Sequence, residues 1–196
     1  TVEIYLKIFK DSTIILSTWD TDINKNFYNN YKDKIKIIIN EKPKNILHTT
    51  DLQTLSTSSA IKYAKDLNLK YCLKTRTDCR IYKKNTITYL KNLLKLFPIN
   101  QKFEKLKSRI ISCSVDTRKY RVYGFSDIML FGSIENIDKY FENESFEMGI
   151  EKYNFGKYPS VINETPVVHE IFLCARFLKN CNIEIDWTLS DWWNKC

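Results

Sequence analysis

A short apolar run that ends in charged residues, at residues 71–80, carries the strongest chemical signal in the chain. It reads YCLKTRTDCR, which puts Asp78 between Arg76 and Arg80 directly after a predicted strand. Ligands of α/β proteins bind beyond the carboxyl ends of strands, where a carboxylate can hold Mg²⁺ or Mn²⁺ together with a diphosphate. Arginine can bind a phosphate through two parallel hydrogen bonds. An ion pair between Asp78 and its neighbours fits the same pattern about equally well.

An earlier segment, residues 16–22, combines hydroxyl, aromatic and acidic side chains at the end of another apolar run. Thr18, Trp19 and Asp20 stand where that run ends. A nucleotide base could stack on the indole of Trp19, and Asp20 could accept a hydrogen bond from a ribose hydroxyl. The pattern alone favours the simpler interpretation, in which Trp19 covers the core and the acids are solvated turn residues.

Two further carboxylates, Asp127 and Glu170, complete the candidate catalytic residues. Asp127 directly precedes an apolar strand, where a carboxylate without a partner is costly. Glu170 and Glu164 lie near the start of a predicted helix, and either could act as a general base. Structural roles remain open, because Asp127 can cap a turn and acids complement the dipole at a helix N-terminus. His169 could bind metal or phosphate, although the structural role is favoured for it.

An alternation of short β-type runs and helical stretches must position these residues, and it predicts a mostly parallel sheet covered by helices. The predicted strands are residues 2–9, 13–19, 35–39, 70–74, 110–115 and 126–132. The predicted helices are residues 56–67, 87–97, 133–141 and 164–178. Residues 187–193 show no regular pattern.

The composition is that of one ordinary globular domain over residues 1–196. The chain is 43% hydrophobic, which suffices for one core but not comfortably for two. No run approaches the ~18 apolar residues of a membrane-spanning helix. The six cysteines form no CxxC pair, which favours free thiols in a reducing compartment. The first residue is not Met, so the chain can be part of a longer protein.

A formal net charge of +8 points to anionic partners, which include nucleic acid, acidic membranes and phosphorylated small molecules. The lysines are spread among asparagines and isoleucines, a bias that AT-rich genes also produce. The charge therefore has little weight alone, although it could support loose peripheral binding to anionic lipid.

The order of these motifs resembles the WavE-type lipopolysaccharide-synthesis glycosyltransferases, and more distantly small viral and bacterial GT-A enzymes. The matching features are the strand end at residues 17–19, a polar helix start at residues 53–56, the run at 74–78, the run at 124–127 and a late helix with an acidic start. The resemblance spans residues 14–178. Its most specific parts are residues 75–78 and 126–127.

The resemblance implies a GT-A-like nucleotide-binding sandwich, with a mostly parallel central sheet flanked by helices. Its implied activity is inverting sugar transfer from a nucleotide-diphosphate sugar to a glycan or lipid-linked acceptor. Asp78 would bind Mn²⁺ or Mg²⁺, and Arg76 stands where the family's first metal-binding acid is expected. Glu170, and after it Asp127, would be the base. The implied donor-binding residues are Thr18, Trp19, Asp20, Gln53, Ser56 and Arg76.

Two other functions remain as alternatives. A sugar nucleotidyltransferase would have a Gly-rich basic loop after the first strand, and residues 17–22 contain neither glycine nor lysine. A non-catalytic nucleic-acid-binding module would gather basic and aromatic residues on one face, and no such motif is evident. We therefore expect a cytoplasmic enzyme, acting at the membrane face if its acceptor is lipid-linked, with no nucleic-acid partner.

Overall fold

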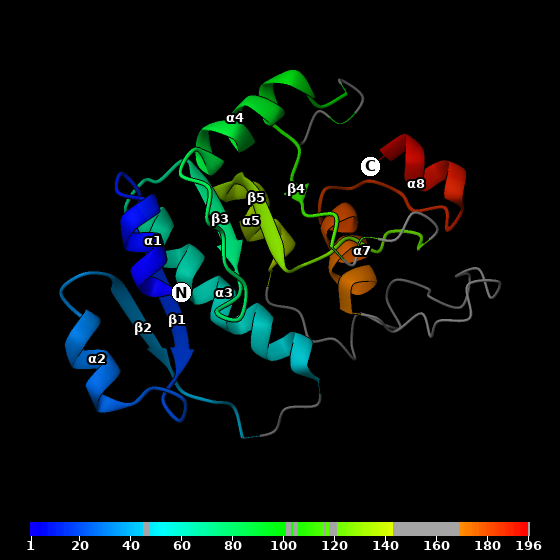
Figure 1. The fold of residues 1–196 in the computed structure, drawn as a ribbon. Coiled ribbons are helices and arrows are strands. Elements are labelled where there is room, and N and C mark those ends of the chain that lie inside the picture. The colour runs from blue at the N-terminus through cyan, green and yellow to red at the C-terminus, as the bar shows by residue number, and fades with distance from the viewer. Residues whose placement is uncertain are drawn as a thin grey trace.

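The computed structural model describes residues 1–44, 48–100, 103, 106–115, 117, 121–142 and 169–195 (Figure 1). The helices are α1 (Val2–Ile8), α2 (Lys25–Tyr31), α3 (Thr49–Asp66), α4 (Thr86–Leu96), α5 (Ile134–Tyr140), α7 (His169–Asn180) and α8 (Leu189–Lys195). The strands are β1 (Ile15–Trp19), β2 (Lys36–Asn40), β3 (Tyr71–Thr75), β4 (Ile111–Ser112) and β5 (Met129–Ser133). The predicted α/β class is confirmed.

The first sheet is the parallel pair of β1 and β2. Ile15 pairs with Lys36 and Trp19 with Asn40, and α2 makes the crossover that parallel strands require. Asn24 starts α2, because its side chain accepts a hydrogen bond from the backbone N–H of Phe27 at 2.7 Å. Most residues of both strands are β-branched or apolar, as in the run Ile37–Ile39 of β2, and such residues suit a half-buried pleated surface.

The second sheet has the strand order β3-β5-β4, and both of its pairings are antiparallel. The register places Tyr71 opposite Ser133 and Thr75 opposite Met129. The prediction of a mostly parallel central sheet therefore does not hold for the described residues, which form one parallel pair and one antiparallel three-stranded sheet. The local pattern identifies β-type runs, but the choice of partner depends on contacts between distant segments.

Two predicted elements are wrong at the ends of the chain. Residues 2–9 were expected to form a strand but contain α1, because Tyr5 and Phe9, one turn apart, are both buried and their ring centroids lie 5.3 Å apart. The tail expected to be irregular contains α8. There the hydroxyl of Thr188 accepts from the backbone N–H of Asp191 at 3.1 Å, and Lys195 pairs with Asp191 one turn later.

Other predicted elements differ from the structure in their bounds. The helix predicted at residues 56–67 begins seven residues earlier, as α3 (Thr49–Asp66), so Ser56 lies within the helix and not at its start. The strand predicted at residues 110–115 is short, with only Ile111 and Ser112 paired in β4. The helix predicted at 164–178 is described from His169 onward as α7, and residues 164–168, including the candidate base Glu164, lie outside the described residues.

The core is centred on α7, whose residues 171–178 are all buried, and on β5 and α5. Arg176 lies within this core, where its guanidinium donates to the carbonyl of Tyr140 at 2.9 Å and lies over the ring of Phe172. Helix α3 contacts β1, β2 and α5, and α5 contacts β3, β5 and α7. The two helices thus connect the two sheets (Figure 1). In the described part of the chain, no helix has the length and apolar character needed to cross a bilayer.

Ser133 joins β5 to α5, and we expect its replacement by alanine to destabilise the fold. Its hydroxyl accepts from the backbone N–H of Asn136 at 3.2 Å and so caps the helix. Loss of such a cap lowers the free energy of unfolding by about 1 kcal/mol. Urea denaturation of S133A and of S12A, an exposed serine without a helix to cap, measures the effect. Equal stabilities of the two variants would contradict the capping role.

Candidate functional site

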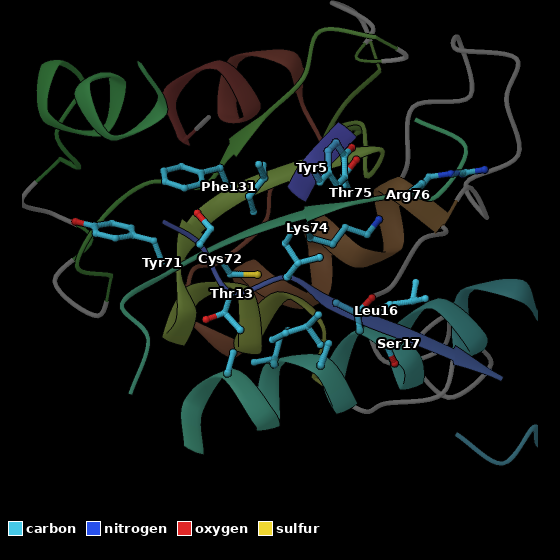
Figure 2. Close-up of a pocket in the computed structure, with 18 of the residues that line it drawn as sticks. Tyr5, Thr13, Leu16, Ser17, Tyr71, Cys72, Lys74, Thr75, Arg76 and Phe131 are labelled. Carbon is cyan, nitrogen blue, oxygen red and sulfur yellow. The ribbon is translucent and has the colours of Figure 1, made fainter. Parts of the chain in front are cut away.

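A cavity of about 890 Å³ lies between β1 and β3 and above α3 (Figure 2). Ligand sites commonly have volumes of roughly 300–1,000 Å³. Its interior is lined partly by apolar side chains such as Leu16, Ile61 and Phe131. β1 and β3 belong to different sheets, so the cavity occupies the space where a continuous sheet would join them.

Polar side chains line the cavity near the carboxyl end of β3. Lys74 and Arg76 come from that strand and the residue beyond it, Gln53 and Ser56 from α3, and His169 from the start of α7. Figure 2 shows the side chains of Lys74 and Arg76 extending from this end of the strand. The arrangement places two cationic groups beside amide, hydroxyl and imidazole groups, which is suited to an anionic ligand with hydroxyl groups.

Asp127 is the centre of this polar group, with a side chain that is only 3% exposed. One carboxylate oxygen, Oδ2, accepts from the side-chain amide of Gln53 and lies 3.8 Å from Nζ of Lys74. The other oxygen, Oδ1, lies 3.9 Å from Nε2 of His169. Lys74 also donates to the backbone carbonyl of Asp127. Both oxygens of this buried carboxylate therefore face donors or cations, as a buried charge requires.

The strand register explains how Asp127 reaches this position. Met129 pairs with Thr75, so the chain that enters β5 passes the carboxyl end of β3 just before the pairing begins. The backbone N–H of Ser126 donates to the hydroxyl of Thr117 at 3.0 Å, and the hydroxyl of Ser112 donates to the carbonyl of Ser126. These bonds hold the residue next to Asp127 on both backbone groups.

Glu170 extends the polar group through His169. Nε2 of His169 lies 3.4 Å from Oε1 of Glu170, and the other oxygen, Oε2, is buried without a hydrogen-bond partner among the described residues. One ligand atom from each of Asp127, His169 and Glu170 lies within 4.8 Å of the other two. Two carboxylates and an imidazole are a donor set that Mn²⁺, Fe²⁺ and Zn²⁺ accept. The group could hold such an ion, or Glu170 could accept a proton.

Burial perturbs the basicity of Lys74. Desolvation lowers its pKa to about 8, against the attraction of Asp127, which favours the charged form, and with a further lowering by Arg76. The ammonium is therefore able to lose its proton close to neutral pH, unlike an ordinary lysine. Cys72 lies on the same strand, and burial raises the pKa of its thiol to about 11, so this thiol stays protonated at neutral pH.

Asp78, the predicted metal ligand, lies outside the Asp127–His169–Glu170 group. Arg76 donates to both of its oxygens, with Nε 3.0 Å from Oδ1 and Nη2 2.8 Å from Oδ2. This guanidinium holds the pKa of the Asp78 carboxyl below its usual range. The structure thus contains the neighbouring ion pair that the sequence pattern left open, at an exposed edge of the cavity where both residues are among the lining.

The predicted donor-binding residues divide into two groups. Gln53, Ser56 and Arg76 all line the cavity. In β1 the last residue that lines it is Ser17, so Thr18 and Trp19 are not part of the lining. Beyond it the backbone carbonyl of Thr18 accepts from the side chain of Asn40, and the half-buried Trp19 lies at the strand end.

Asp20 has a structural role in the turn that follows β1. Its Oδ1 accepts from the backbone N–H groups of Thr21 at 3.0 Å and Lys42 at 3.2 Å. These bonds match the solvated-turn interpretation of the acid and leave Asp20 away from the cavity lining.

Sequence reasoning gave Lys74 no role and rated His169 as structural. A signal for Lys74 was present, because it is the only residue in the run YCLKT that ordinarily carries a charge at neutral pH. A half-buried strand position calls for a partner for such a charge. The partner of His169 could not be anticipated, because Asp127 is 42 positions away in the sequence.

Comparison with known proteins adds no relative to this description. No family model, curated protein or solved structure matches the chain.

The depressed pKa of Lys74 predicts a dependence of stability on pH. Between about pH 8 and 10.5 the unfolded chain keeps the lysine proton while the folded chain has lost it, so stability rises with pH in this window. The rise from pH 7.5 to 10 should be about 2 kcal/mol. Urea denaturation of the parent and of K74M at both pH values isolates this effect, because Cys72 titrates in both proteins. The same pH dependence in K74M would contradict it.

Proposed function

We propose that the protein is a glycosyltransferase that moves a sugar from a nucleotide-diphosphate sugar to a hydroxyl group of a glycan or lipid-linked acceptor, on a scaffold of the GT-A type. One observation carries the proposal. Gln53, Lys74 and His169, from three separate parts of the chain, line a cavity large enough for a nucleotide. All three lie against the buried carboxylate of Asp127, and His169 also lies against Glu170.

The cavity supplies the features that a nucleotide-diphosphate sugar requires. Lys74 and Arg76 are cations at the carboxyl end of β3 and would bind the diphosphate. The partly apolar interior between β1 and β3 would take the base or sugar. Thr75 offers a buried hydroxyl oxygen, which has no hydrogen-bond partner within the described residues and lines the same cavity. Such an atom is costly when empty and favours a ligand with polar groups.

A divalent metal fits the residues present. Asp127, His169 and Oε1 of Glu170 would hold it, because one ligand atom from each residue lies within 4.8 Å of the other two. Bound there, the ion would neutralise negative charge that develops on the departing diphosphate. Asp78 remains the ligand that the family resemblance predicts, but using it requires Arg76 to release both of its oxygens.

Glu170 is the stronger of the two candidate bases. Both oxygens of Asp127 face Gln53, Lys74 or His169, whereas only Oε1 of Glu170 faces His169. Oε2 of Glu170 would accept the proton of the acceptor hydroxyl. The oxygen of the acceptor hydroxyl would attack the anomeric carbon as the bond to the diphosphate breaks, which inverts the configuration at that carbon. The acceptor must first gain access to Oε2, which neighbouring atoms cover.

The metal assignment predicts different behaviour of two aspartates. Binding of UDP, GDP, CMP and dTDP-sugars is measured by calorimetry with and without Mn²⁺. We expect Mn²⁺ to tighten binding of one nucleotide class at least ~tenfold, and D127N to abolish this gain while D78N keeps it. D138N, an exposed aspartate paired with Lys65, is the matched control.

The reverse result would identify Asp78 as the ligand. Because Asp127 is buried, H169A provides a second variant, and circular dichroism confirms that each variant is folded. Absence of binding with every nucleotide in a folded sample would contradict the transferase proposal itself.

The base assignment predicts a loss of turnover in E170Q. Removal of a general base lowers kcat by roughly 10²–10⁴-fold. The amide keeps the shape of the side chain and an oxygen that can still face the metal, so KM for the donor, measured in saturating Mn²⁺, should change little. Nucleotide release in the presence of acceptor measures both constants. E184Q, a change at an exposed glutamate on the loop after α7, should behave as the parent. Unchanged kcat in E170Q would exclude Glu170 as the base.

A further inference from the structure

We propose that α4 and its two flanking segments form a docking surface for an anionic phospholipid membrane. The chain from residue 79 to residue 103 contains no aspartate or glutamate. Within it Lys83, Lys84, Lys91 and Lys95 are all exposed. A net charge of one sign over so long a stretch contrasts with the remainder of the chain, where acids and bases are mixed.

Exposed apolar side chains are gathered on the same stretch. Tyr82, Tyr89, Leu96 and Phe97 are between 61% and 71% exposed, and three of the four are on α4 or the residue that follows it. Single exposed apolar residues are normal on protein surfaces, but a group of large ones among lysines marks an interaction site.

The helix geometry directs these side chains away from the molecule. Leu90 is the buried residue of α4, and Leu93 and Leu94 beside it are half-buried. Tyr89 and Leu96 are seven residues apart, so they share a face of the helix. α4 lies along the upper edge of the molecule in Figure 1, away from α2 at the lower left.

This combination matches a bilayer surface better than it matches single-stranded nucleic acid. Lysines near a bilayer are attracted to anionic headgroups, and leucine and phenylalanine enter the boundary between headgroups and acyl chains. Single-stranded nucleic acid also pairs lysines with aromatic rings, but bases stack on planar rings and gain nothing from a protruding Leu96. Lys91 is partly committed already, since its Nζ lies 5.2 Å from the ring centre of Tyr71. Lys83, Lys84 and Lys95 therefore remain the main headgroup contacts.

Vesicle co-sedimentation of the whole chain tests the proposal without reference to catalysis. We expect binding to phosphatidylcholine vesicles with about one third phosphatidylserine to be at least ~tenfold tighter than binding to pure phosphatidylcholine, and to weaken in high salt. K83E/K84E and L96S/F97S should each weaken binding at least ~tenfold, because one removes headgroup attraction and the other removes insertion.

The control K25E/K32E makes the same change in charge at two exposed lysines around α2. It should leave vesicle binding within about twofold of the parent, because screening confines the attraction to charges near the surface. All substituted residues are exposed, and thermal unfolding monitored by circular dichroism verifies that each variant is folded.

Three results would overturn the proposal. They are equal binding to neutral and anionic vesicles, equal loss in K25E/K32E and K83E/K84E, and unchanged binding in L96S/F97S. Tight binding of a single-stranded oligonucleotide that K83E/K84E abolishes, without vesicle binding, would assign the surface to nucleic acid instead.

Discussion

The buried negative charge of Asp127 is the constraint on which the polar end of the molecule depends. A carboxylate in this position would be strongly destabilising without partners. Its partners come from α3, β3 and α7, in the form of Gln53, Lys74 and His169. Compensation of one charge therefore fixes how three elements meet. Burial lowers the pKa of Lys74, and the attraction of Asp127 offsets part of this lowering, so the site is coupled to pH.

Much of the scaffold could be predicted from local patterns. Runs of apolar residues located β1, β2, β3 and β5, and helical spacing located α3, α4, α5 and the described part of α7. Pairing was not predictable in this way, because β3 takes β5 as an antiparallel neighbour through contacts between segments far apart in the chain. The short terminal helices were missed since their stability comes from packing of residues such as Tyr5 and Trp192, not from their own length.

The candidate site was predictable in its residue types but less so in its grouping. Gln53 was named only through the family resemblance. Arg76 and Asp127 could be named because charged residues at the ends of apolar runs need a partner, and Glu170 because it lies at the start of a predicted helix. Their partners could not, since Asp127 faces Lys74 and His169 only after β3, β5 and α7 have packed. Asp78 illustrates the opposite case, in which an adjacent arginine already satisfies the acid.

The separation of β1 from β3 has a consequence for how the molecule holds together. Where two strands are joined by a ladder, backbone hydrogen bonds transmit force between them, but here the two sheets are bridged through α3 and α5. A ligand that filled the 890 Å³ between the strands would contact both sheets and so add packing interactions between them. Occupancy of the cavity would then restrict the motion of the two sheets relative to each other, and the protein without a ligand would be the more flexible form.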